Sequence, residues 1–509
     1  MRIGLPSESY EGRLFLLPSC GFVGVSSCKE FVCFLPIRCG GGLRFLALLT
    51  CIFTTISPIA ATAAEPVEIP SNNQTTITTA WNASPTVSGP ATYAIDNNGK
   101  IWQWGEQWDV PQKAAVEAGN NPVFTQLSFA NGEPESLSQT DTTGFLNSSR
   151  IWALDDKGIV WYQDNLGVFT KYAEGQPYTL TRIEAAQRGG CYGITTGGNV
   201  VRFGFPGWDK NMKLVSLPSK AVSLTVSKGD YTGPTMRDSL GNVLAVLADG
   251  TVYEWQDMTF GTSTEDRLGT PSQIEFPSGV TIRQASMMKT YYYNSFGLAI
   301  DSTGQAWGWG TNTSGQLGNG KTGDNLINGQ KPTPTKVNMP AGVVFTRIVA
   351  GATEGPGNES LGYGIALDQN GDAWAWGDNS VGNFGNGGYK QSLVPTKVSM
   401  PNGVKFVEID SSHAPDTASA SSWVVAKASD GSVWTWGNGP VGNNRTDNNP
   451  TIPAKATDFG SAGTGTTIAC APTTGVVPTG LMTIGLLSLL VWGCGIMLIV
   501  FRRMLQRVD

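Results

Sequence analysis

Few residues outside the first 63 carry side chains suited to catalysis. His413, the one histidine among 509 residues, follows Ser412, so a Ser-His-Asp triad or a histidine-based zinc site would have to use it. A hydrogen-bonding role in a loop is the simpler interpretation of His413. Cys191 lies in an apolar stretch, which favours a buried thiol over a nucleophile. We therefore expect no metal site and no cofactor.

Carboxylates offer two further chemistries. Asp368 to Asp372 reads Asp-Gln-Asn-Gly-Asp, which suggests calcium. An EF-hand loop needs a longer spaced set of ligands ending in Glu, so a tight turn is the better interpretation. A pair of acid and base carboxylates, as in glycosidases, stays open as an alternative, although no spacing singles out a pair. The glycines punctuate strands and do not open helices, which argues against a phosphate-binding loop.

The composition excludes several classes of protein. The chain has 64 Gly and 16 Trp but only 15% charged residues. A coiled coil needs charged, glycine-poor heptads, and a disordered chain lacks aromatic residues. The net charge of −6 gives no basic footprint for nucleic acid. A globular fold rich in turns remains.

A repeat organises the middle of the chain. A short apolar strand, a polar turn ending in glycine and a second strand recur seven times, 40 to 67 residues apart. The turn glycines are Gly99, Gly158, Gly198, Gly250, Gly304, Gly371 and Gly431. Five residues before each glycine stands a small residue: Ala94, Ala153, Gly193, Ala245, Ala299, Ala366 and Ala426. Asp-Gly and Asn-Gly turns predict tight hairpins.

The second strand of each hairpin carries aromatic residues three and five positions after the glycine. Because side chains alternate along a strand, both positions lie on one face. The clearest pairs are Trp102 and Trp104, Trp307 and Trp309, Trp374 and Trp376, and Trp434 and Trp436. We expect this ladder to fill the gap between neighbouring sheets.

Two more elements complete each repeat. A Pro-x-x-x segment, as at Pro334 and Pro395, follows the aromatic strand and predicts an outer edge strand, where proline is tolerated. Segments such as those beginning at Phe345 and Phe406 precede the next hairpin. Four strands a repeat and seven repeats predict an all-β, seven-bladed β-propeller over residues 65–460. A parallel β-helix is the alternative, but its repeat is much shorter.

The repeats resemble the regulator of chromosome condensation repeat. The residues that carry the resemblance are Ala306-Trp307-Gly308-Trp309-Gly310 with Gly315-Gln316-Leu317-Gly318, and Ala373-Trp374-Ala375-Trp376-Gly377 with Gly385-Asn386-Gly387. The resemblance spans about residues 70–460 and is strongest in the last three copies. It implies a seven-bladed propeller. Lys427 departs from it, because the other copies have an apolar residue there.

Closure of the ring is expected from the two ends of the repeat region. The last copy stops after its edge strand near Ala456, with no inner strand following. Residues 75–81, before the first hairpin, have the composition to supply it. We therefore expect both chain ends to build the final blade.

The N-terminal 63 residues look like a secretory leader. Arg44 precedes an apolar run over residues 45–59, followed by Ala61-Thr62-Ala63. This order of charge, apolar core and small residues is typical of a cleaved signal. The start site before residue 44 stays open.

The C-terminal end predicts a membrane anchor. Residues 481–501 are long and apolar enough to cross a bilayer as a helix, and the basic tail 502–509 predicts its cytoplasmic side. The Gly-, Thr- and Pro-rich stretch 461–480 predicts a flexible stalk. Within it, Pro472, Thr473, Thr474 and Gly475 resemble a sortase sorting motif. A sortase is thus a candidate partner. Its cleavage after Thr474 would remove the membrane segment.

These features favour a cell-surface binding module with a protein or glycan ligand, displayed on the outer face of the cell envelope. Candidate contact residues are aromatic residues in loops, together with the loop histidine: Trp108, Tyr291, Tyr292, Tyr293 and His413. A carbohydrate-active surface enzyme and a structural or adhesive surface protein are the alternatives. Guanine-nucleotide exchange, which the resemblance also implies, conflicts with export, because a cytosolic GTPase would be out of reach.

Overall fold

The computed structural model describes the repeat region in a series of segments, all within the compact unit Val67–Asp509. The segments are 76–84, 87–105, 108–130, 150–164, 167–172, 176–186, 190–204, 212–227, 242–257, 268–289, 295–323, 333–355, 359–412, 422–443 and 450–460. The predicted leader, stalk, membrane segment and tail lie outside them. No helix within the described segments is long and apolar enough to cross a membrane.

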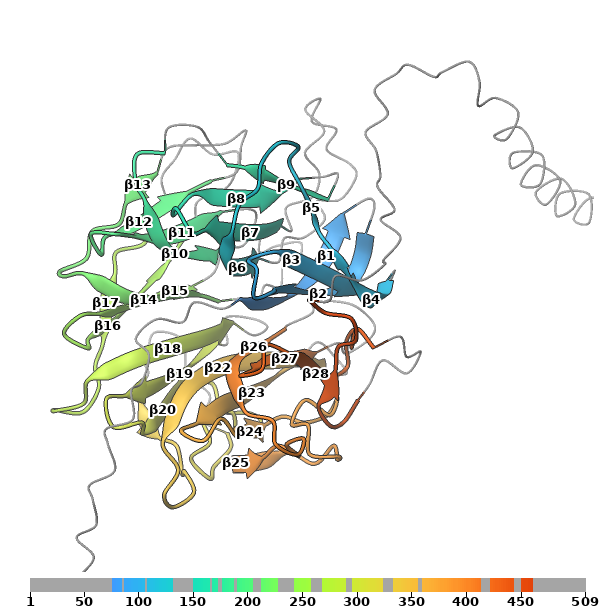
Figure 1. Cartoon of the computed structure of the whole chain (residues 1–509). Coiled ribbons are helices and arrows are strands. Elements are labelled where there is room, and N and C mark those ends of the chain that lie inside the picture. Colours follow the sequence, from blue (N-terminus) through green and yellow to red (C-terminus); the bar gives the residue numbers. More distant parts are fainter. Residues whose placement is uncertain are drawn as a thin grey trace, which may run out of the picture. The chain divides into compact units, whose positions relative to one another are not determined.

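The described strands form seven sheets, each with four antiparallel strands, that follow one another in chain order (Figure 1). Blade 1 holds β1 (Ile77–Ser84), β2 (Val87–Ile95), β3 (Ile101–Gly105) and β4 (Trp108–Lys113). Blade 2 holds β6 (Phe124–Ala130), β7 (Arg150–Asp155), β8 (Val160–Gln163) and β9 (Val168–Lys171), with β5 (Ala115–Val116) added parallel to β9. Blade 3 holds β10 (Leu180–Ala185), β11 (Cys191–Thr195), β12 (Val200–Phe203) and β13 (Lys213–Leu214).

The remaining blades repeat this order. Blade 4 holds β14 (Ala221–Val226), β15 (Asn242–Leu247), β16 (Val252–Gln256) and β17 (Ser272–Ile274). Blade 5 holds β18 (Ile282–Lys289), β19 (Ser295–Asp301), β20 (Ala306–Gly310) and β21 (Thr335–Lys336). Blade 6 holds β22 (Phe345–Gly355), β23 (Glu359–Asp368), β24 (Ala373–Gly377) and β25 (Ser392–Lys397). Blade 7 holds β26 (Phe406–Ser411), β27 (Trp423–Ala428), β28 (Val433–Gly437) and β29 (Ala454–Lys455). The predicted seven-bladed propeller of four-stranded blades is confirmed.

The hairpin glycines set the position of each blade against the next. All seven have positive φ, as the predicted turns require. In six of them the carbonyl oxygen accepts a hydrogen bond, 2.8–3.2 Å long, from the first inner-strand residue of the following blade, as Gly371 does from Phe406. A Cβ at Gly99 would lie 2.4 Å from Val123, so any side chain at this position would clash with the next blade.

An aspartate braces four of the hairpins. In blade 6, Asp368 Oδ1 accepts hydrogen bonds from the backbone N–H groups of Asn370 and Asp372, and Oδ2 accepts one from Trp374 Nε1 at 3.0 Å. Asp96, Asp155 and Asp301 do the same in blades 1, 2 and 5. Both oxygens of Asp368 are therefore used by its own turn, which confirms the turn interpretation over the calcium one.

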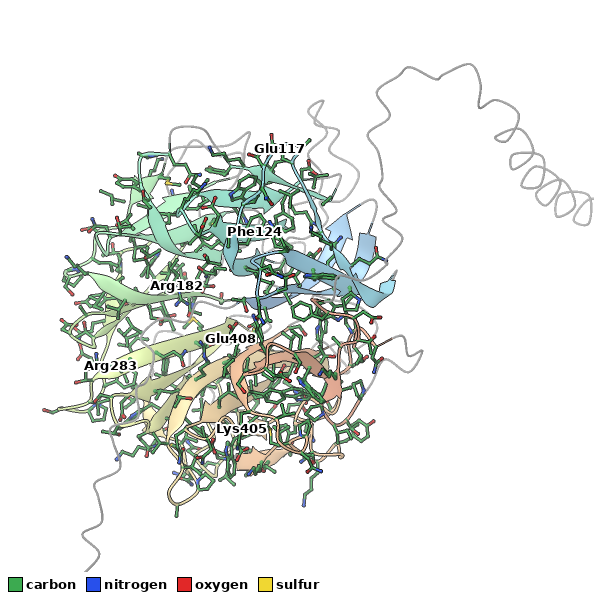
Figure 2. The ribbon with its side chains drawn as sticks, viewed as in Figure 1. Glu117, Phe124, Arg182, Arg283, Lys405 and Glu408 are labelled. Atoms are coloured by element: carbon green, nitrogen blue, oxygen red, sulfur yellow. The ribbon has the colours of Figure 1, made fainter. Side chains whose placement is uncertain are left out.

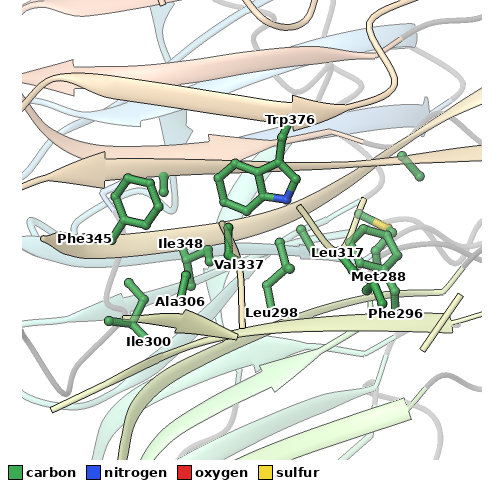
Figure 3. Close-up of a cluster of buried hydrophobic side chains, with 13 residues drawn as sticks. Met288, Phe296, Leu298, Ile300, Ala306, Leu317, Val337, Phe345, Ile348 and Trp376 are labelled. Atoms are coloured by element: carbon green, nitrogen blue, oxygen red, sulfur yellow. The ribbon is translucent and has the colours of Figure 1, made fainter. Parts of the chain in front are cut away.

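Each junction between blades has its own apolar cluster, seven in all among the described residues. The second tryptophan of the ladder lies in these junctions: Trp376 of blade 6 packs on Leu317 and Val337 of blade 5 (Figure 3). Its Nε1 donates to the carbonyl oxygen of Gln316 at 2.9 Å. A Cβ at Gly318 would lie 2.8 Å from that nitrogen, so the glycine-rich loop makes room for the ring. The expectation that the ladder fills the gap between blades is confirmed.

The small residue before each turn lies in the second strand of its blade. It is buried in every copy, between an inner-strand residue and the first aromatic position: Ala366 pairs with Ile348 on one side and with Trp374 on the other. In blade 3, a Cβ at Gly193 would lie 2.6 Å from Leu180 Cδ1. Large neighbours on both sides explain why only a small side chain fits.

The predicted closure of the ring is wrong. Blade 7 has its own inner strand, β26, and the segment expected to complete it forms β1, which pairs with β2 inside blade 1. No described blade combines strands from both chain ends. A shared strand is unnecessary because the first and last blades are joined through side chains. Ile77 and Trp104 of blade 1 pack with Val425 and Val433 of blade 7.

Candidate functional site

The first strands of all seven blades surround a central cavity. Two layers of side chains from these strands encircle the axis. In every blade, one residue of the first strand pairs with the small residue of the second strand. The residue just before it belongs to the first axial layer, which consists of Thr76, Gln126, Arg182, Ser223, Gln284, Arg347 and Glu408. The second axial layer lies two residues further on: Thr78, Ser128, Glu184, Thr225, Ser286, Val349 and Asp410. All but Val349 are polar.

The polar layers provide hydrogen-bond partners at the open edges of several blades. An inner strand pairs on one side only, so its outward backbone groups need other partners. Gln126 of blade 2 donates from Nε2 to the carbonyl oxygen of Ile183 in blade 3 at 2.6 Å, and its Oε1 accepts from the same residue's N–H at 3.0 Å. Gln284 of blade 5 likewise accepts from the N–H of Ile348 in blade 6 at 2.8 Å.

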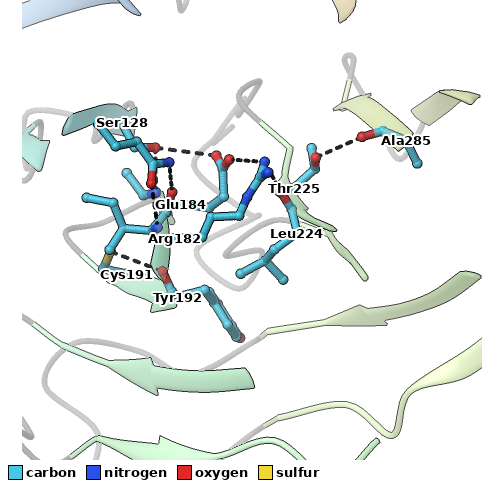
Figure 4. Close-up of polar contacts among 11 residues, drawn as sticks. Ser128, Arg182, Glu184, Cys191, Tyr192, Leu224, Thr225 and Ala285 are labelled. Atoms are coloured by element: carbon cyan, nitrogen blue, oxygen red, sulfur yellow. Dashed lines mark hydrogen bonds and ion pairs between the residues drawn. The ribbon is translucent and has the colours of Figure 1, made fainter. Parts of the chain in front are cut away.

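The second layer repeats this arrangement one step along the strands. Ser128 Oγ accepts from the N–H of Ala185 at 2.8 Å, and Ser286 Oγ accepts from the N–H of Ala350 at 3.0 Å. Thr225 Oγ1 donates to the carbonyl oxygen of Ala285 at 2.9 Å (Figure 4). Side chains of one blade thus hydrogen-bond the backbone of the next, which fixes the blades around the axis.

A buried ion pair lies within these layers. Arg182, 2% exposed, donates to Glu184 Oε1 at 2.7 Å and to the carbonyl oxygen of Leu224 at 2.6 Å (Figure 4). Burial lowers the pKa of the Arg182 guanidinium, and Glu184 acts in the opposite direction. Arg182 thereby joins blade 3 to blade 4, and Glu184 lines the cavity.

Blade 7 meets blade 1 through carboxylates. Glu408 Oε2 accepts from the N–H of Thr76 at 2.6 Å, and Thr78 Oγ1 donates to Asp410 Oδ2 at 3.2 Å. Figure 2 places Glu408 and Arg182 toward the middle of the ring of blades. The acidic groups of the axis therefore have hydrogen-bond donors within the fold.

Exposed apolar residues gather on the loops of the last two blades. Tyr389 is 59% exposed and Ile452 is 51% exposed. Their loops are joined, because Gly387 N donates to the carbonyl oxygen of Thr451 at 2.8 Å and a Cβ at Gly387 would lie 3.8 Å from Ile452. We call Tyr389 and Ile452 the rim pair. No sequence pattern predicts this pair, because a tyrosine beside a glycine-rich turn gives no indication of its exposure.

The sequence-predicted contact residues stay predictions. Tyr291, Tyr292, Tyr293 and His413 lie outside the described residues, as do the sorting-like residues 472–475. Trp108 begins β4, where its Cα pairs with that of Gly105, and its side chain lies outside the described part.

Cys191 is buried, as predicted. Burial raises the pKa of its thiol well above the ordinary value, and the negative charge of Glu184 adds to the shift. The neutral thiol is a poor nucleophile. Among the described residues, no group of three His, Cys, Asp or Glu side chains is placed to hold a metal ion.

Comparison with known proteins agrees with this geometry. The family model for the regulator of chromosome condensation (RCC1) repeat matches residues 303–353 and 370–414. The ultraviolet-B receptor UVR8 of Arabidopsis thaliana is 30% identical over 158 residues, which cover 30% of this chain and 31% of the receptor. The mitochondrial RCC1 domain-containing protein RUG3 of the same plant is 25% identical over 294 residues, covering 57% of this chain and 61% of RUG3. The human E3 ubiquitin-protein ligase HERC2 is 27% identical over 203 residues, covering 38% of this chain and 4% of the ligase.

Two solved structures are similar at low identity. Yeast RCC1 (Prp20), in its structure with Kap60, has a TM-score of 0.46 and 16% identity, covering 69% of this chain and 79% of Prp20. Human WBSCR16 has a TM-score of 0.46 and 12% identity, covering 69% of this chain and 84% of that protein.

The seven sheets and their axial layers define the protein as a seven-bladed β-propeller. Its similarity to the regulator of chromosome condensation repeat lies in the two matched segments, which link blades 5, 6 and 7. The chain spans less than two thirds of the length of each of these three curated relatives. Propellers of this kind typically serve as protein-interaction modules.

Proposed function

We propose that this chain is a binding module displayed on the outer face of a cell, and that it uses the loops of blades 6 and 7 to hold a protein partner. The rim pair is the observation that carries the proposal. Tyrosine and large aliphatic side chains supply much of the affinity in protein interfaces.

The support beneath the rim pair suits binding. The loop that carries Tyr389 is fixed at its base, where Asn379 Nδ2 donates to the carbonyl oxygens of Gly388 and Lys390 at 2.9 and 3.2 Å. A loop held in one conformation loses less entropy when a partner binds. Tyr389 is therefore presented on a rigid support.

Display outside the cell is proposed from the sequence of both ends. The leader-like residues 1–63 and the apolar segment 481–501 with its basic tail predict export of the repeat region. Residues 472–475 offer attachment to a cell wall by a sortase as the second route.

Binding is tested by immobilising the full-length chain and identifying cross-linked proteins from the native cell surface. Tyr389→Ser with Ile452→Ser should reduce capture of the partner at least about tenfold, since central contacts contribute about 2 kcal/mol or more. Leu214→Ser is the matched control, because Leu214 is 55% exposed but lies in blade 3. Equal loss in the control, or full capture by the double variant, would contradict the proposal.

Display is tested separately by treating intact cells with protease. Cleavage of the repeat region in intact cells is expected, and protection until lysis would exclude surface display. Mass spectrometry of the mature C-terminus then separates the routes: a chain ending at Thr474 supports sorting, and an intact peptide containing Arg502 supports a membrane anchor.

A further inference from the structure

Arg347 differs from the other charged residues of the axis. It lies in β22 in the first axial layer and lines the central cavity. At the other junctions described above, the axial side chains hydrogen-bond the next blade. Within the described part of the chain, no hydrogen bond or ion pair reaches the Arg347 guanidinium, and its second-layer neighbour is the apolar Val349.

The surroundings of Arg347 leave it short of an acceptor. Burial lowers the pKa of its guanidinium, the charge of Glu408 raises it and that of Arg182 lowers it. Glu408 accepts hydrogen bonds from both the N–H and the hydroxyl of Thr76. Arg347 is half-buried and lines the cavity, so an acceptor from outside the chain can reach its guanidinium, where a charge-assisted hydrogen bond would be favourable.

Gln284 supplies a second donor beside it. Its Oε1 accepts from the N–H of Ile348, the residue after Arg347, at 2.8 Å. That contact directs the carbonyl end toward blade 6. The amide NH₂ group of Gln284 is then the end available to the cavity, which Gln284 also lines. A fork of guanidinium and amide donors suits a planar oxyanion.

We propose that the central cavity binds a monovalent carboxylate between Arg347 and Gln284. The cavity holds about 50 Å³, room for roughly three or four water molecules, which matches a carboxylate head group. The nearby carboxylates of Glu184, Glu408 and Asp410 would repel a phosphate or sulfate dianion more strongly than a single charge. This inference is independent of the proposed protein-binding rim.

The test is calorimetric titration of the full-length protein with sodium acetate, against sodium chloride at the same ionic strength. Saturable acetate binding is expected for the wild type. Arg347→Gln should weaken it at least about tenfold, because the charge-assisted hydrogen bonds are lost. Arg283→Gln is the matched control: it removes the same charge from the neighbouring inner strand β18, where the side chain is exposed (Figure 2).

A second variant keeps the proposal testable if Arg347→Gln does not fold. Gln284→Glu keeps the acceptor for Ile348 and places a carboxylate next to Arg347, so it should abolish acetate binding. No saturable binding by the wild type, or unchanged affinity in either cavity variant, would overturn the proposal.

The source of the carboxylate is identified with peptides. A short peptide with a free C-terminus that competes with acetate, while its amide does not, supports a partner's chain end as the ligand. Binding of acetate without competition by either peptide supports a free small carboxylate.

Discussion

Lys427, in the second strand of blade 7, donates from Nζ to the carbonyl oxygen of Ile95 in blade 1, 3.0 Å away. The same ammonium donates to Thr76 Oγ1 at 3.0 Å. Its position holds an aliphatic residue in the other six copies. The departure from the repeat therefore has a structural reason: it lies where the last blade meets the first, and a long cation can reach the backbone there.

Replacing Lys427 by methionine should lower the free energy of unfolding by about 1–3 kcal/mol, because the Ile95 carbonyl loses a buried donor while the side-chain volume is kept. Lys427 is only 9% exposed. Urea denaturation measures the change. Lys390→Met, at an exposed lysine, is the comparison, and an equal effect of both variants would show that the closure contact is unimportant.

Adding a methyl group at Gly385 should destabilise the junction of blades 6 and 7. Its Cβ would lie 2.8 Å from Trp436 Cδ1 and 3.0 Å from Val398 Cγ1, in addition to the strain of a positive φ. Gly403 also has a positive φ but open space around it. Gly403→Ala should cost about 1–2 kcal/mol from φ alone, and Gly385→Ala clearly more, by thermal unfolding. Equal costs would contradict the close approach between blades.

Removing the indole nitrogen from Trp376 should cost more than removing it from Trp309. Trp376 Nε1 donates to the Gln316 carbonyl oxygen across the junction, whereas Trp309 Nε1 has no partner among the described residues. Both rings are buried, so the loss of ring volume is matched. Trp376→Phe should exceed Trp309→Phe by about 1 kcal/mol in chemical denaturation. The reverse order would argue against the interblade hydrogen bond.

The free energy of unfolding should fall at alkaline pH because of the buried phenol of Tyr363. Burial raises the pKa of this phenol to about 12 from an ordinary value of 10.0, and its hydroxyl lies 2.9 Å from Ser422 Oγ. As the pH rises past about 10, the unfolded chain loses this proton first, so stability declines until the folded protein also ionises near pH 12. The loss attributable to one such group is about 2–3 kcal/mol.

Unfolding free energies at a series of pH values from 9 to 12 test this. Tyr363→Phe should show a shallower decline than the wild type, and Tyr389→Phe, at an exposed tyrosine, should not. If the slopes of wild type and Tyr363→Phe agree, Tyr363 is not the group that titrates.

Much of the fold follows from local signals that the chain repeats seven times. The glycine of each turn, the small residue five positions before it and the tryptophans after it all report contacts within one blade or with the next blade in sequence. Proline in the outer strands, as at Pro334 and Pro395, indicates an edge strand, because proline has no backbone N–H to donate. Such contacts recur at a fixed spacing, so they are visible in the sequence.

Closure and the central cavity were decided by the tertiary structure alone. Thr76 and Glu408 meet only because seven blades bring the two ends of the ring together, and the expectation of a shared strand failed for that reason. The rim pair depends on which face of a loop meets water, which no spacing encodes. Gln126, Arg182 and Gln284 look like ordinary polar residues of alternating strands. Convergence on the axis gives them their roles, because the open edges of seven inner strands require partners from the neighbouring blade.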